Sequence, residues 1–444
     1  MGSGTVALSV LKDSSRRPGP VPVSLPSFKR RKLVSCPQVR YLKWVLLGLC
    51  LRILFMPFSM HSNPDFVGDM IAMNREAHLL AFEPDSSEIS PPVYPPLAYY
   101  TMALLQRLAL PILPVLEEHI ALEPQSHSRW LSESHLFRYL FVRKAWYLVF
   151  DLGTALLLAI LTKRASDAIG IVKFWMVNPV VIYTGYIHGQ FDIVPVFFVT
   201  LAVYCAKIKR PVLAALSLGI GACYKVYPIM LALPLIIMLG SSALSRLRLA
   251  LAAMTPYLVT VLASISCMRF VFVDTDFYRQ RFFPLTYELG YDQKVHLFPI
   301  VYCLLLWHIA HRRRSFSGLW RFMFIILSLY YAQAVFDLHY LTWIMPFAAL
   351  LFVENREVII PYLVILACIV LLYFKVPLGL FLLPIEPDFF GRLPSVHELL
   401  SPYLPMTLII DVSRSVLIGT LLWLAYRVFS SISDDVTGPE TIEG

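Results

Sequence analysis

Apolar runs long enough to cross a membrane follow one another along most of this chain. A helix needs roughly 20 apolar residues to span the hydrocarbon core of a bilayer. Hydrophobic residues make up 58% of the 444 residues here, whereas charged residues make up only 15%. A soluble globular domain of this size would carry far more charge. Because lipid offers no hydrogen bonds to the backbone, the sequence predicts an all-α polytopic membrane protein.

Basic residues lie in short clusters between the apolar runs, the pattern that orients membrane helices with such clusters in the cytosol. The clusters account for the net charge of +9, so we expect a membrane rather than a nucleic acid as partner. They share one side only if the proline-flanked segment 94–115 forms a helix in the plane of the opposite interface. About twelve transmembrane helices are then predicted, at about 40–58, 136–162, 168–187, 192–208, 211–226, 228–241, 248–271, 297–311, 318–336, 340–353, 357–374 and 404–428.

Both ends of the chain are polar and lie outside this bundle. Residues 1–39 are predicted to be a disordered cytosolic tail, residues 430–444 an acidic cytosolic tail, and residues 40–429 the transmembrane domain. The cysteines lie almost all inside apolar runs and show neither a disulfide framework nor the spacing of metal ligands. The long loops expected on the non-cytosolic side are 59–93, 272–296 and 375–403.

The stretch 178–192 begins as an apolar run and ends in closely spaced polar side chains, among them His188, Gln190 and Asp192. A membrane span that finishes on polar groups often does so where something binds. The alternative is a helix end whose polar groups meet headgroups and water. Lys225 and His339 fall on the same predicted face. Their alternatives are a lysine that extends to the interface and a structural histidine in a turn.

Two loops on this face carry further candidates. Asp69, four residues after Asp65 and just beyond the first span, could act as a general base, because partial desolvation raises the affinity of a carboxylate for a proton. A solvated loop acid is the alternative. The loop 272–296 places Arg281 and Lys294 among aromatic residues, an arrangement that suits a lipid-linked phosphate.

Other charged residues receive structural or weaker interpretations. Asp151 follows Lys144 by seven residues, two turns along the same helical face, and this spacing predicts a structural contact inside the bundle. The triplet Asp274-Thr275-Asp276 resembles the metal-binding acidic pairs of sugar-nucleotide enzymes, but alone it is only a weak indication of a metal site.

Several of these blocks resemble the membrane-embedded glycosyltransferases that use a polyprenyl-phosphate sugar, the GT-C superfold. The resemblance is strongest to the dolichyl-phosphate-glucose-dependent glucosyltransferases of N-glycan precursor assembly. Gly68-Asp69 is similar to the Gly-Asp of the family's Gly-Asp-Tyr, and residues 187–192 resemble its Gly-His-Phe-Gln-Tyr-Asn. Residues 281–285 and 292–295 resemble its Arg-Leu-Phe-Pro-Phe and Asp-Lys-Val-Ala. Lys225 and His339 lie in shorter matches.

The resemblance implies an inverting glycosyltransferase of the endoplasmic reticulum membrane whose active site faces the lumen. It implies that Asp69 removes the proton from an acceptor hydroxyl on a lipid-linked oligosaccharide, which then displaces dolichyl phosphate from the sugar, glucose in this family. The scheme requires no divalent metal or cofactor. The leaving phosphate would be stabilised by Arg281, Lys294, His339 and Lys225, and the sugar or acceptor pocket would be lined by His188, Gln190 and Asp192.

Departures from the family pattern leave alternatives open. Asp192 stands where the family has Asn, and the Glu and Lys that follow the family's His are missing after His339. The donor could therefore be dolichyl-phosphate mannose instead. A transporter or scramblase would also be hydrophobic, but should show internal repeats, and we detect no convincing repeat. A non-catalytic assembly factor would share the fold and lack the base, against which the presence of Asp69 argues mildly.

Overall fold

The computed structural model describes most of the predicted membrane domain. Residue placement is defined for 37–58, 94–112 except 110, 136–263, 283–312 except 284 and 292, 315–373 except 336, 379, 382 and 385–434. The loop candidates Asp65, Asp69 and Arg281 lie outside these residues, as does the triplet 274–276.

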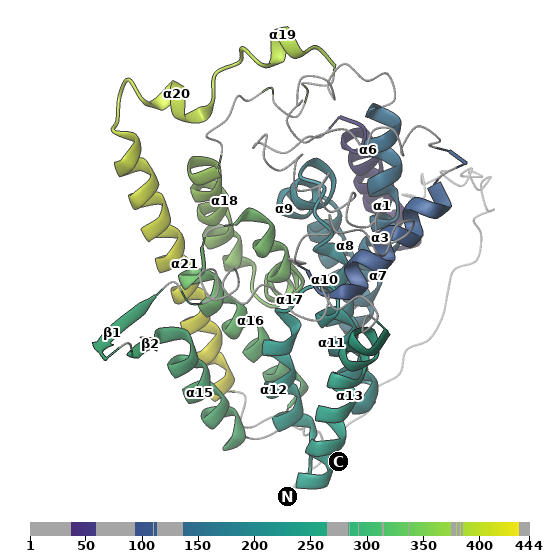
Figure 1. Ribbon diagram of the computed structural model, residues 1–444, viewed down its shortest axis with the longest axis vertical. Helices are drawn as coiled ribbons and strands as arrows, with labels where there is room; N and C mark the ends of the chain where they lie inside the picture. The colour runs from purple at the N-terminus through teal and green to yellow at the C-terminus, as the bar shows by residue number, and fades with distance from the viewer. Residues whose placement is uncertain are drawn as a thin grey trace, which may run out of the picture. The chain divides into compact units, whose positions relative to one another are not determined.

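A helix overlaps each predicted span, and another lies within the segment predicted to lie in the membrane plane (Figure 1). Residues 264–271 of the predicted span 248–271 lie outside the described residues. The first half contains α1 (Pro37–Phe55), α3 (Pro96–Ala109), α6 (Leu136–Ala145), α7 (Tyr147–Leu161), α8 (Ala165–Met176), α9 (Pro179–Ile182), the π-helical turn η1 (Tyr183–Ile187), α10 (Ile193–Lys207), α11 (Pro211–Ala222) and α12 (Pro228–Leu239). The second half contains α13 (Ala243–Ala263), α15 (Leu297–Ala310), α16 (Phe316–Gln333), the 3-10 helix η3 (Leu338–Trp343), α17 (Met345–Glu354), η4 (Arg356–Val358), α18 (Ile359–Tyr373), α19 (Pro387–Phe390), α20 (Val396–Leu400) and α21 (Met406–Asp434).

Only some of these helices meet the length of a membrane crossing. Within the described ranges, four helical segments are long and apolar enough to cross, or five if the bent pair α8 and α9–η1 forms one span. Several others are apolar but run for only 10 to 17 residues. The structure therefore agrees with a helical membrane protein, while the number of twelve crossings stays a prediction. Helix α21 also continues to Asp434, past the predicted end of the domain at 429.

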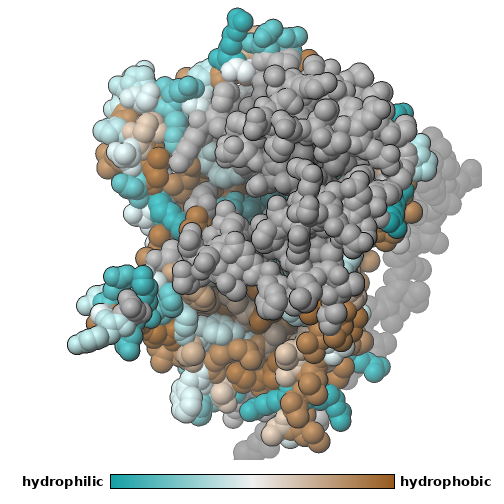
Figure 2. Space-filling model, viewed as in Figure 1, coloured by the Kyte–Doolittle hydropathy of each residue, from teal (hydrophilic) through white to brown (hydrophobic). Residues whose placement is uncertain are grey.

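Large apolar side chains point outward from the bundle. On α13, Leu244, Leu251 and Leu262 are 56 to 68% exposed, and on α15 Trp307 is 72% exposed. Figure 2 shows such apolar surface over the lower part of the molecule. Exposed apolar area of this extent is unusual for a protein surface in water, and it is what a helix facing lipid tails requires.

A short β-hairpin departs from the all-α prediction, because it forms inside the predicted loop 272–296. Strand β1 (Thr286–Gly290) pairs antiparallel with β2 (Gln293–His296). The turn between them uses Gly290 and Tyr291, both at positive φ. Figure 1 shows the hairpin projecting from the bundle beyond α15 and α21.

The predicted span 168–187 is broken rather than continuous. Helix α8 ends at Met176, and the next helical segment is bent by 41° from it. Pro179 explains the break, because its ring prevents the helical hydrogen bond and disfavours helical backbone in the residue before it. Asn178 then begins α9 by accepting hydrogen bonds from the backbone of Val180 and Val181.

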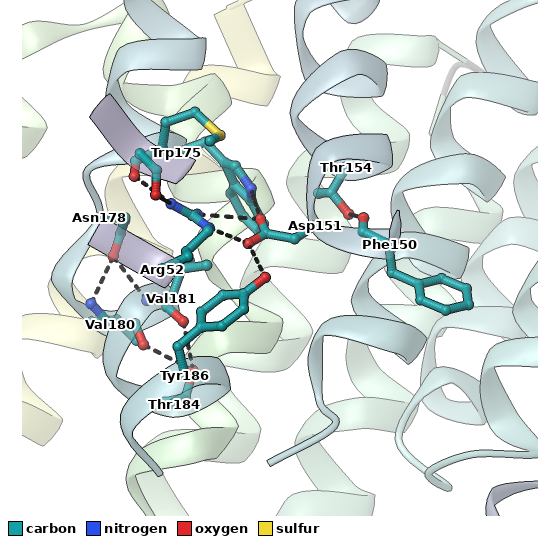
Figure 3. A network of polar contacts seen from close by, with 12 residues as sticks. Arg52, Phe150, Asp151, Thr154, Trp175, Asn178, Val180, Val181, Thr184 and Tyr186 are labelled. Carbon is teal, nitrogen blue, oxygen red and sulfur yellow. Dashed lines mark hydrogen bonds and ion pairs between the residues drawn. The ribbon is translucent and has the colours of Figure 1, made fainter. Parts of the chain in front are cut away.

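A fully buried ion pair joins the elements around this break (Figure 3). Arg52 of α1 binds both carboxylate oxygens of Asp151 on α7. Trp175 of α8 donates to the same carboxylate at 2.7 Å, and Tyr186 of η1 donates to it at 2.7 Å. Asp151 therefore makes the expected structural contact, but with Arg52. Lys144, the expected partner, bonds to the backbone oxygen of Tyr186.

Candidate functional site

Five of the eight predicted site residues are buried inside the bundle, on or next to segments that contact one another, and we call these five residues the cluster. All five are buried, with exposed fractions between 1% and 8%. His188, Gln190 and Asp192 lie between η1 and α10. Lys225 lies just before α12, and His339 lies in η3, so segments distant in sequence supply the five residues.

Asp192 is the most highly bonded of these side chains. Its Oδ2 lies 2.8 Å from Lys225 Nζ, and its Oδ1 accepts a hydrogen bond of 2.6 Å from the indole nitrogen of Trp343. Lys225 therefore does not extend to the interface as an isolated interfacial lysine would. A buried carboxylate with both oxygens bound holds the ammonium in a fixed position.

Aromatic rings cover the ammonium of Lys225. Its Nζ lies 5.3 Å from the ring centre of Tyr94 and 5.1 Å from that of Phe191. Both distances are within the range of a cation–π attraction. The two rings pack edge to face against each other at 5.0 Å. Tyr94, which lies two residues before α3 begins, thus packs against one side of the Lys225 ammonium.

The two predicted histidines lie side by side. The ring centres of His188 and His339 are 5.6 Å apart. His339 Nδ1 lies 2.8 Å from Asp337 Oδ1, a distance that suits an ion pair when the imidazole is protonated. The hydroxyls of Thr184 and Thr342 share a buried hydrogen bond of 2.7 Å. That bond ties η1 to η3, the two elements next to the histidines.

The cluster combines an ammonium, two imidazoles, an amide and aromatic faces. Ammonium and imidazolium groups bind oxyanions such as phosphate, and aromatic faces with amide groups suit a sugar or lipid. No group of three or more potential metal ligands occurs in the part of the chain that the structure describes.

Lys294 is not part of this cluster. It lies on β2, where it pairs with Glu288 at 2.8 Å while both side chains stay more than half exposed. The ammonium of Lys294 lowers the pKa of the Glu288 carboxyl through a hydrogen bond and its charge. The predicted role of Lys294 in binding phosphate stays a prediction, as do the roles of Asp69 and Arg281.

Sequence reasoning missed three contributors to the cluster: Tyr94, Asp337 and Trp343. A signal existed for two of them. Asp337 is the carboxylate nearest to His339 in the sequence, and Trp343 follows His339 by four residues, the spacing of one α-helical turn. A tryptophan buried at this depth usually needs an acceptor for its indole N–H, and Asp192 provides one.

Comparison with known proteins adds one partial similarity. No family model matches the chain. A segment is 28% identical over 119 residues to GPI mannosyltransferase 1 of Kluyveromyces lactis. This segment covers 26% of the chain and 29% of that protein, so the similarity spans under a third of either. The relative is a mannosyltransferase, whereas the motifs resembled glucosyltransferases, and the match does not decide between the two sugars for this chain.

Proposed function

We propose that this chain is a membrane-embedded glycosyltransferase that moves a hexose from dolichyl phosphate to a lipid-linked acceptor. The observation that carries the proposal is the burial of Gln190, Lys225 and the two histidines inside an apolar bundle. Polar groups in such surroundings cost free energy, and they usually mark a place where a polar ligand binds. The partial similarity to a mannosyltransferase supports the same class of reaction.

The donor phosphate is the ligand that best suits this cluster. As the bond from the anomeric carbon to the phosphate oxygen breaks, the bonding electrons stay with the phosphate, which becomes more negative. A fixed positive charge in a site of low dielectric stabilises that change strongly. Lys225 supplies this charge in the proposal, and His339 supplies a second when protonated. Asp192 and Trp343 orient the ammonium.

Loop residues complete the proposed reaction. Asp69 removes the proton from the acceptor hydroxyl, whose oxygen attacks the anomeric carbon from the side opposite the phosphate, so that the configuration inverts. Arg281 and Lys294 are proposed to bind the phosphate from loop 272–296, and His188 and Gln190 to hold sugar hydroxyls. The site is proposed to face the lumen of the endoplasmic reticulum, where the reaction runs without a metal.

The sugar is the open part of the proposal. The motif resemblance favours glucose and a lipid-linked oligosaccharide acceptor, as in N-glycan precursor synthesis. The partial match favours mannose and a GPI-type acceptor. Purified protein in detergent, given dolichyl-phosphate glucose or dolichyl-phosphate mannose with a panel of both acceptor types, should add one hexose to one acceptor. Product mass identifies the acceptor, and the donor supplied identifies the sugar. No hexose transfer from either donor would overturn the proposal.

The proposed base is tested with an isosteric substitution. Asp69→Asn keeps the size of the side chain but cannot take the proton, so turnover should fall by about 100- to 10,000-fold with little change in donor affinity. Asp65→Asn in the same loop is the matched control, with a mild effect expected. Turnover lost in Asp65→Asn and kept in Asp69→Asn would move the base to Asp65.

A further inference from the structure

One face of the α6–α7 span bonds to the turn that precedes the candidate site. Lys144, Tyr147 and Asp151 share this face because they are spaced by three and four residues. Lys144 Nζ donates to the backbone oxygen of Tyr186 at 3.0 Å, and the Tyr147 hydroxyl donates to that of Gly189 at 2.8 Å. The hydroxyl of Tyr186 reaches back to Asp151 at 2.7 Å (Figure 3).

The turn that receives these bonds has an uncommon backbone. The amide of His188 donates to the carbonyl of Tyr183 at 2.6 Å, and that of Gln190 to the carbonyl of Thr184 at 2.9 Å. The first bond reaches the fifth residue back, as in a π-helix, and the second reaches the sixth, whereas an α-helix bonds to the fourth. π-Helical turns are rare in proteins. Gly189 adds a φ of +82°. The conformation therefore needs support from outside the segment.

The Asp151 carboxylate on α7, which accepts the hydrogen bond from Tyr186, is itself held in place by other residues. Asp151 receives Tyr186 while it is also bound by Arg52 from α1 and by Trp175 from α8. Arg52 in turn donates to the backbone oxygens of Gly48 and Met176. A carboxylate held from three elements is a fixed point against which the turn can be placed.

We propose that Tyr147 and Tyr186 are positioning residues of the candidate site. Their hydroxyls fix the turn and thereby set where His188 and Gln190 stand relative to Asp192 and His339. This inference rests on the proposed function in so far as it concerns catalysis. Displacement of a catalytic arrangement by about 1 Å can cost on the order of 100-fold in rate. Loss of one hydroxyl should therefore lower the kcat of hexose transfer.

The test removes single hydroxyls and leaves the rings. Tyr147→Phe and Tyr186→Phe are compared with Tyr302→Phe, which loses a bond of the same kind, from a tyrosine hydroxyl to the backbone oxygen of Met230 at 2.6 Å between α15 and α12. For each protein we would measure the melting temperature in detergent, the kcat and KM of hexose transfer, and amide hydrogen exchange of residues 183–192.

The expected result separates positioning from general stability. All three variants should melt at similar temperatures. Only Tyr147→Phe and Tyr186→Phe should speed amide exchange in 183–192, by about five- to tenfold for one lost hydrogen bond. Their kcat should fall on the order of 10- to 100-fold, while Tyr302→Phe stays near wild type.

Two results would overturn the inference. One is exchange of 183–192 at the wild-type rate in both site variants. The other is faster exchange with a kcat no lower than that of Tyr302→Phe, because the turn would then move without consequence for the reaction. A wild-type protein that transfers no hexose would instead overturn the proposed function. The exchange measurement would still decide whether the hydroxyls hold the turn.

Discussion

The ion pair between Asp192 and Lys225 is the contact on which the proposed donor site depends. Removal of one partner leaves a buried charge alone, so Lys225→Met should lower the free energy of unfolding by about 3–5 kcal/mol. The double variant Asp192→Asn/Lys225→Met buries no charge, and its Asn keeps an oxygen for Trp343. It should regain most of the stability, as measured by unfolding in detergent, and still lack transfer. Wild-type transfer by the double variant would reduce the pair to a structural contact.

Candidate site residues could be selected from the sequence where a short motif carried them. The motifs singled out His188, Gln190, Asp192, Lys225 and His339; the structure buries all five, and their roles stay predictions. The bond from Trp343 to Asp192 could not be predicted, because it joins positions 151 apart in sequence. Likewise the partner of Asp151 is Arg52 on another helix, and local spacing offers no information about a contact across the bundle.

The helix broken between α8 and α9 leads directly into the candidate site, so the backbone at its end decides where the site residues stand. Gly189, two residues after η1 ends, has a φ of +82°, whereas a Cβ added at Gly185 within η1 would meet nothing within 4 Å. Gly189→Ala should therefore cost about 1–2 kcal/mol of stability from backbone strain, and it should also reduce transfer. Gly185→Ala should be neutral or slightly stabilising, because alanine loses less backbone entropy in a helical turn. Thermal unfolding of both variants in detergent checks the contrast, and equal losses would contradict it.

Helix positions, though not their exact ends, were predictable because each apolar run overlaps a helix in this chain. The break after α8 was not predicted, although Asn178-Pro179 signals it. Periodicity averaged over a whole apolar run hides such a local interruption. The hairpin of β1 and β2 was also missed. Its turn at Gly290 and Tyr291 lies within a stretch that hydropathy marks only as a loop.

All candidate site residues are predicted to lie on the luminal side of the membrane. If loops 59–93 and 375–403 face the lumen, glycosylation acceptor sequences inserted near Ser87 and near Gly391 should both be modified. One inserted near Arg313 should not, because the basic cluster there is predicted to lie in the cytosol. The measurement is a shift in electrophoretic mobility that a glycosidase reverses. Modification at Arg313 would invert the orientation and remove the luminal site.

If the cluster receives the phosphate of a lipid-linked sugar, as we propose, photo-crosslinking should show it most directly. A polyprenyl phosphate with a diazirine on its first isoprene unit places the reactive carbon within a few ångströms of the phosphate. After irradiation in detergent, mass spectrometry should find label in the peptides carrying residues 183–192, Lys225 or 338–343, and excess dolichyl-phosphate hexose should suppress it. Label that this competitor does not suppress, or that maps only to the exposed face of α13, would contradict the account.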